Sequence, residues 1–165
     1  MVLIALLLAC GAPKVDATNL PTIAVNTAMV AQSPAAVDAM RAPIERVLQA
    51  ERLTATAVAT NDAWAGLGTS GHRTAWLLER TDGALSLLIE ADARRRATLV
   101  GRFQWEVSAT VIVAQADLPT LEQTTVMRVT LPHSHQDERD ALASAAPRIG
   151  HYAAGLVRQF HGQPE

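Results

Sequence analysis

Hydrophobic and polar residues alternate most regularly in the middle of the chain. From residue 103 to residue 113 every second residue is apolar, and most of the residues between them are polar. A side-chain period of two is typical of a strand with one face in a core and the other in water. Shorter runs of this kind at 85–89 and 125–131 predict an antiparallel sheet. We expect the arginines at 94–96 to lie in or near the turn after the first run.

The first half of the chain predicts two strands separated by a helix. Residues 21–26 and 53–60 are rich in residues that favour strands. Between them, Ser33 and Pro34 are residue types that suit an N-cap and a first helical position, and apolar residues follow at spacings of three and four. Pro43 lies inside this predicted helix and is expected to kink it.

Two later segments have a helical pattern. Residues 72–79 lack clean alternation, which favours a short helix over the first arm of a hairpin that turns at 82–83. Nearer the C-terminus, residues 149–160 carry a continuous apolar stripe. Pro147 is expected to mark the start or a kink of this last helix, with residues 137–146 forming an earlier turn or two.

These elements predict a single α+β domain over residues 22–161. Interleaved strands and helices, followed by consecutive strands and a closing helix, indicate a mostly antiparallel sheet of four to five strands with two or three helices packed on one face. With 165 residues, 49% of them apolar, the chain can bury one core. A formal net charge of −2 gives no reason to expect nucleic acid as a partner. The single cysteine, Cys10, excludes an intramolecular disulfide.

The chain opens with an apolar run, residues 1–9, that ends in Ala9 directly before Cys10. The run is too short to span a bilayer, which takes about 20 apolar residues. Its length and final small residue suit the hydrophobic part of an export signal, although no Lys or Arg precedes it. Either the true start lies upstream, or the run is an apolar strand or helix of an ordinary domain, in which Cys10 would be a buried residue.

A glycine-rich segment, residues 66–71, matches the dinucleotide-binding pattern G-x-G-x-x-G, and Glu90 and Asp92 lie about 20 residues further on. In that pattern the glycines must directly follow a strand, so that a helix N-terminus meets the pyrophosphate. Here residues 61–65 separate the predicted strand from the first glycine. The segment therefore predicts a loop, and we expect no cofactor.

His133, His135 and Asp137 resemble the H-x-H-x-D-H metal-binding signature of metallo-β-lactamase-fold hydrolases. Glu138 stands where that signature has its last histidine, and the other three histidines are scattered along the chain. These residues keep a metal-dependent hydrolase as an unfavoured alternative. They are read more simply as a polar connection between strand and helix, with Ser134 as the cap. No other catalytic motif is present, so the sequence favours a protein that is not an enzyme.

Arg94, Arg95 and Arg96 form the one cluster of positive charge and are the candidate residues for contact with anionic lipid. The tryptophans are expected to pack in the core or at its rim. They are Trp64, Trp76 and Trp105.

Ala9 and Cys10 resemble the lipobox of bacterial lipoproteins. The resemblance implies that residues 1–9 are a signal peptide, that the Cys10 thiol is acylated and becomes the mature N-terminus, and that residues 10–21 are a tether. Gly11 follows the cysteine, and without an aspartate there the resemblance implies transport to the outer membrane, with the domain facing the periplasm. The implied partners are the membrane, through acylated Cys10, and another envelope protein.

The order of elements, with the segment 77–89 running from a helix end into an apolar strand, resembles the small α+β domain of CsgG-type secretion lipoproteins, the TolB N-terminal domain and the penicillin-binding-protein activator LpoB. That resemblance implies an interaction module without catalysis. The alternative is an LptE-like lipoprotein of the lipopolysaccharide translocon, whose pattern also begins with Cys-Gly. From Cys10 to Thr22 the chain reaches at most about 40 Å, which favours a role close to the membrane.

Overall fold

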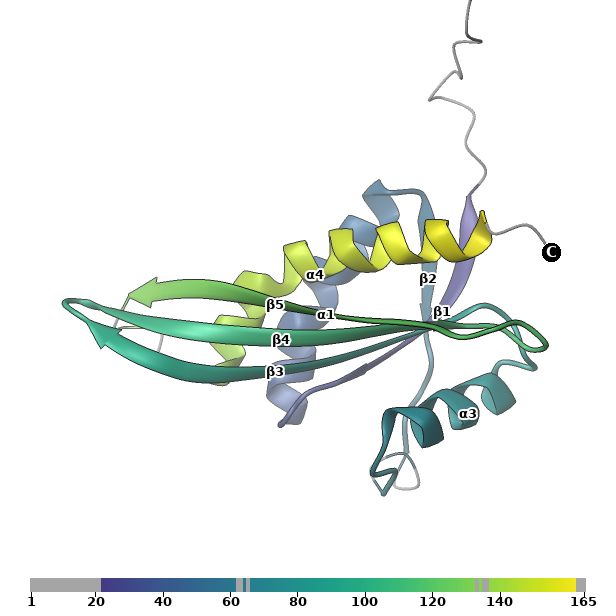
Figure 1. The fold of residues 1–165 in the computed structure, drawn as a ribbon, viewed down its shortest axis with the longest axis horizontal. Coiled ribbons are helices and arrows are strands. Elements are labelled where there is room, and N and C mark those ends of the chain that lie inside the picture. The colour runs from purple at the N-terminus through teal and green to yellow at the C-terminus, as the bar shows by residue number, and fades with distance from the viewer. Residues whose placement is uncertain (1–21, 62–63, 65, 133, 135–136, 163–165) are drawn as a thin grey trace, which may run out of the picture.

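A computed structural model of the chain describes residues 22–61, 64, 66–132, 134 and 137–162. At its centre lies a five-stranded sheet with the order β2-β1-β3-β4-β5. Its strands are β1 (Ile23–Val30), β2 (Leu53–Ala57), β3 (Ser86–Leu99), β4 (Arg102–Ala114) and β5 (Leu121–Pro132). Its helices are α1 (Pro34–Ala50), α3 (Ser70–Arg80) and α4 (Glu138–His161). The predicted α+β fold is confirmed (Figure 1).

The sheet is mixed, and its two kinds of pairing follow the order of the chain. β1 pairs in parallel with both β2 and β3, whereas β3, β4 and β5 form an antiparallel meander. Parallel neighbours need a crossover connection, because the chain must return to the starting edge of the sheet. α1 lies in the crossover from β1 to β2, and α3 lies in the crossover from β2 to β3.

The first face of the sheet is covered by α1 and α4, which pack against each other as well as against the strands (Figure 1). Every second residue of β4 from Phe103 to Val113 is buried on this face, as its alternation predicted. The two helices approach closely at Gly150, where an added Cβ would lie 2.9 Å from the Cβ of Val47. This layer holds the main hydrophobic core.

Within the described residues, the second face is covered at one end only. There α3 and the segment before it bury a small cluster against three strands. The cluster consists of Ala28, Trp64, Leu77, Leu88 and Ile112. Beyond α3 the long strands β3, β4 and β5 continue without a covering helix (Figure 1). Part of the antiparallel sheet is therefore covered by helices on a single face.

The two ends of the domain lie at the same end of the molecule (Figure 1). Arg158, near the end of α4, donates to the backbone carbonyl of Glu51 at 2.7 Å and forms an ion pair with its carboxylate at 2.6 Å. The hydrogen bond from Arg158 is the main cause that lowers the pKa of Glu51. Ile23, where β1 begins, lines the same small hollow as His161.

Two sequence predictions about helices are confirmed. Ser33 caps α1, with its side chain accepting from the backbone N–H of Ala36 at 3.2 Å, and Pro34 opens the helix. α1 continues through Pro43 to Ala50. The segment over 72–79 is helical, as part of α3, and is not an arm of a hairpin.

Several boundaries differ from their predictions. The arginines at 94–96 lie within β3, before the turn at 100–101, at a register shift between Arg95 and Ala97. This bulge interrupts the period of two, and the alternation therefore breaks off before the strand ends. α4 is one continuous helix from Glu138, so residues 138–146 belong to it and Pro147 is not its start. Asp137, rather than Ser134, is its N-cap.

Candidate interaction surface

The uncovered part of the second sheet face carries a polar surface along three strands, and we call it the open face. Its side chains alternate with the buried ones along β3, β4 and β5 and lie opposite each other in the ladder. Its members are Glu90, Asp92, Arg94, Arg96, Gln104, Glu106, Ser108, Thr110, Glu122, Thr124, Val126 and Arg128. Val126 is the exposed large apolar residue among them, with 61% of its surface exposed. The surface is therefore polar and carries both signs of charge.

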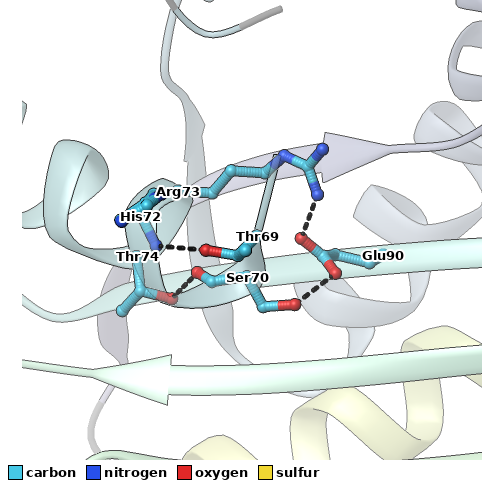
Figure 2. A network of polar contacts seen from close by, with 6 residues as sticks. All are labelled: Thr69, Ser70, His72, Arg73, Thr74 and Glu90. Atoms are coloured by element: carbon cyan, nitrogen blue, oxygen red, sulfur yellow. Dashed lines mark hydrogen bonds and ion pairs between the residues drawn. The ribbon is translucent and has the colours of Figure 1, made fainter. Parts of the chain in front are cut away.

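At the border of the open face, Glu90 fastens α3 to the sheet (Figure 2). Its Oε2 accepts from the Ser70 hydroxyl at 2.6 Å, and its Oε1 accepts from Arg73 Nη1 at 2.8 Å. Both charged side chains are less than one-fifth exposed. A carboxylate at the first turn of α3 also interacts favourably with the positive end of the helix dipole. Because both oxygens are engaged, this arrangement holds the helix in place.

The first turn of α3 is itself well defined (Figure 2). Thr69 is the N-cap, and its hydroxyl accepts from the backbone N–H of His72 at 3.3 Å. Thr74 donates from its hydroxyl to the backbone carbonyl of Ser70 at 2.8 Å. The glycine-rich segment thus leads into a capped helix whose N-terminal side chains bond to Glu90.

The arginines at 94–96 all have partners within the domain. Arg94 Nε donates to Asp92 Oδ2 at 2.8 Å, and Arg96 bonds to Glu106. The hydrogen bond from Arg96 is the main cause that lowers the pKa of Glu106, and the same bond raises the pKa of Arg96. Arg95 lies on the other side of the strand, with its guanidinium carbon 5.1 Å from the ring centre of Phe103. Contact of these residues with anionic lipid stays a prediction.

Glu138, the first residue of α4, lies in an unfavourable environment for a carboxylate. Burial raises its pKa, and the nearby acids Asp92 and Asp137 raise it further, against a lowering contribution from the backbone N–H of Gln32. Its Oε1 atom is buried, and no hydrogen bond joins it to any other residue in the described part of the chain. Gln32 also donates from its side chain to Asp92, so this connection joins the β1–α1 loop to the edge of the open face.

Asp137 is the one described residue among the other site candidates that the sequence suggested. Cys10, His133 and His135 lie outside the described residues. Asp137 is an N-cap, with Oδ1 accepting from the backbone N–H of Asp140 at 3.0 Å. Within the described ranges, no three His, Cys, Asp or Glu side chains are grouped in a way that could hold a metal ion. No described helix has the length and apolarity to cross a membrane.

Sequence reasoning missed the contact of Glu90 with α3. The residues that bond to Glu90 are Ser70 and Arg73, which lie three apart and therefore on one side of a helix. That spacing can be seen in the sequence. Only the structure shows that β3 lies parallel to β1, which places Glu90 next to Ser70 and Arg73. The tryptophans were predicted correctly, since Trp64 and Trp105 are buried and Trp76 packs against the smaller cluster.

No protein-family model matches the chain, and no curated protein matches it. Similar solved structures include a minor lipoprotein from Acinetobacter baumannii, at 11% identity and a TM-score of 0.47, covering 81% of this chain and 94% of that one. The PelC dodecamer from Paraburkholderia phytofirmans is similar at 12% identity and a TM-score of 0.46, covering 82% and 88%. Lipoprotein GNA1162 from Neisseria meningitidis is similar at 10% identity and a TM-score of 0.46, covering 81% and 99%.

Proposed function

We propose that the protein is a non-enzymatic lipoprotein of the cell envelope, acylated at Cys10, whose domain binds another envelope protein close to the membrane. The observation that carries the proposal is the apolar run that ends in Ala9 directly before Cys10. A short tether of about 40 Å at full extension would keep the domain near the anchor. The outer membrane, with the domain facing the periplasm, is the location that Gly11 favours.

The open face supports a role in protein binding. Two acid–arginine ion pairs lie on it, Asp92 with Arg94 and Glu106 with Arg96, so much of its charge is balanced within the surface. Exposed ion pairs of this kind contribute little to stability and can exchange partners at small cost. A partner with complementary charges could therefore use them without leaving a buried charge unpaired.

The anchor is tested with a Cys10→Ser variant of the full chain. Wild-type protein should fractionate with membranes and incorporate an alkyne-labelled fatty acid, whereas the variant should lose the label and appear in the soluble fraction. Ala12→Ser makes a similar change nearby but keeps the thiol, and should behave as the wild type. Membrane fractionation of Cys10→Ser unchanged from the wild type would contradict the proposal.

The LptE-like role is the alternative, and the length of the antiparallel strands favours it. β3, β4 and β5 span 14, 13 and 12 residues, which fits the long strands of that pattern. A photocrosslinking residue in place of Thr110 on the open face would decide between the roles. Crosslinks to an outer-membrane barrel support the LptE-like role, whereas crosslinks to cell-wall or secretion components alone contradict it and favour the CsgG-type or LpoB-type role.

A further inference from the structure

Strand β5 forms a long free edge of the sheet. It is the last strand in the order, and among the described residues it pairs only with β4. A free edge presents a row of backbone donors and acceptors, and proteins usually protect such edges with Lys, with Pro or with very short strands. β5 spans 12 residues, has no lysine, and has its proline only at its last position, Pro132. Its Thr and Val residues favour extended backbone.

Two contacts show which residues of β5 direct their backbone outward. Arg148 Nη2, from α4, donates to the carbonyl of Arg128 at 3.1 Å, so this carbonyl lies on the outer side of the strand. Arg148 must therefore share or release this carbonyl when a second strand pairs with β5. The hydroxyls of Thr110 and Thr124 lie 2.9 Å apart, as suits a directly opposed pair that is not hydrogen-bonded through its backbone. Residues 122, 124, 126 and 128 therefore have outward-facing N–H and C=O groups.

We propose that β5 pairs antiparallel with β5 of a second copy of this chain, about a two-fold axis at Thr125. Because only alternate residues face outward, one strand can shift along the other only in steps of two residues. Each such shift moves the two-fold axis by one residue. In the register centred on Thr125, Glu122 lies opposite Arg128 of the second copy, and Arg128 lies opposite its Glu122. Opposite charges directly across an antiparallel pair are stabilising. The two chains then share one continuous sheet.

The same register also covers the exposed apolar residue of the open face. Val126 lies beside Thr124 of the second copy, and the symmetric contact repeats on the other side of the axis. A register centred on Val126 would instead place Arg128 opposite Thr124 and Glu122 opposite Thr130, without an ion pair. The register centred on Thr124 would place Glu122 opposite Val126. Charge complementarity therefore selects the axis at Thr125.

The other edge strand, β2, is a poorer candidate for the same pairing. It spans five residues, from Leu53 to Ala57, against the 12 residues of β5. Pairing through β2 would add few backbone hydrogen bonds and bring no opposite charges together, because the strand carries none. The second copy is therefore placed on β5.

A cysteine at the axis tests the pairing. In the proposed register the Cα atoms of residue 125 in the two copies form a pair without backbone hydrogen bonds, about 4.5 Å apart. That distance suits a disulfide, for which Cα atoms lie about 4.4–6.8 Å apart. In the full chain with Cys10→Ser, so that no other thiol is present, Thr125→Cys should form a disulfide-linked dimer under mild oxidation on a non-reducing gel.

Val126→Cys in the same background is the matched control. In the proposed register the two copies of residue 126 lie too far apart for a disulfide, so this variant should remain monomeric on the gel. Dimers from Val126→Cys but not from Thr125→Cys would show a different register and overturn the proposal. The absence of dimers from both variants would overturn it as well.

Charge reversal in the same background tests the ion pairs between the two copies. Adding Arg128→Glu to the Thr125→Cys chain places like charges opposite each other, and should slow disulfide formation about fivefold or more. Adding Glu122→Arg to that variant restores opposite charges and should restore the rate. An unchanged rate in the single reversal, or no recovery in the double reversal, would overturn the proposed register.

Discussion

At the scale of single residues, the carboxylate of Glu90 links β3 to the first turn of α3. It lies in β3, and the groups that bond to it, Ser70 and Arg73, lie in the first turn of α3. A carboxylate and a guanidinium that are both less than one-fifth exposed stabilise each other more than a surface pair does, because water screens them less. If either group is removed, the other remains partly buried without a partner, which lowers the stability of the fold.

Replacing Glu90 with Gln should therefore lower the free energy of unfolding by about 1–2 kcal/mol, because the charge-assisted bonds to Ser70 and Arg73 are weakened. Urea denaturation followed by circular dichroism measures the change. Glu106→Gln is the matched control, since Glu106 bonds to Arg96 at a more exposed position and should give a smaller change. An equal loss in both variants would contradict the role of burial at Glu90.

At the scale of elements, α1 and α4 can pack closely because residue 150 has no side chain. Gly150 of α4 faces α1, where an added Cβ would lie 2.9 Å from the Cβ and 3.2 Å from the Cγ1 of Val47. A Cβ atom cannot rotate away, so a side chain at 150 would force the helix axes apart. Gly155, five residues further along, has no such neighbour within 4 Å.

Gly150→Ala and Gly155→Ala should consequently have opposite effects. At Gly155 the alanine gains helix propensity and should stabilise the protein by about 0.5–1 kcal/mol. At Gly150 overpacking exceeds that gain, and we expect a net loss of about 1–2 kcal/mol. Chemical denaturation of both variants measures the difference, and adding Val47→Ala to Gly150→Ala should recover part of the loss. Stabilisation by Gly150→Ala alone would contradict the close packing.

The elements differ in how well the sequence predicted them, for identifiable reasons. α1 was predicted through Ser33 and Pro34 because a cap and an apolar period agree locally. Residues 94–96 of β3 were wrongly placed in or near a turn, because three consecutive charged residues are typical of exposed turns. Their place in the strand becomes clear only from the acids on β3 and β4 that pair with them. Ser134 and Asp137 are both good capping residues, so only the structure distinguishes them.

Long-range pairing was the part that local patterns could not supply. The parallel placement of β1 between β2 and β3 brings together segments that are far apart in the sequence. Such contacts depend on how crossovers pack, which no single run of residues encodes. The contact of Glu90 with α3 and the free edge of β5 both follow from this strand order.

For the whole molecule, the two halves of the sheet differ in how they are covered. Residues 87–89 and 111–113 lie between α3 on one face and the α1–α4 layer on the other, and all of them are at most 2% exposed. Residues 97–104, around the β3–β4 turn, lie beyond α3, and Val100 is fully exposed. Regions with fewer buried contacts open more readily than the core does.

Amide hydrogen exchange should reveal this difference directly. We expect backbone amides in 87–89 and 111–113 to exchange slowest, at rates set by global unfolding, and those in 97–104 to exchange many times faster through local opening. Mass spectrometry of peptides from timed exchange measures both regions in one experiment, so each serves as the control for the other. Equal protection of both regions would contradict unequal coverage of the sheet.

The meeting of both domain ends at one place has a practical consequence for labelling. Ile23 and His161 line the same hollow, whereas the turn at 100–101 lies at the far end of the long strands (Figure 1). A fluorescent domain fused after α4 would emerge near Ile23, where β1 begins, and would sample the surroundings of that end of the domain. A small tag inserted at 100–101 would sample the other end of the long axis. Two reporters on one chain could thus measure how the molecule is oriented in the cell.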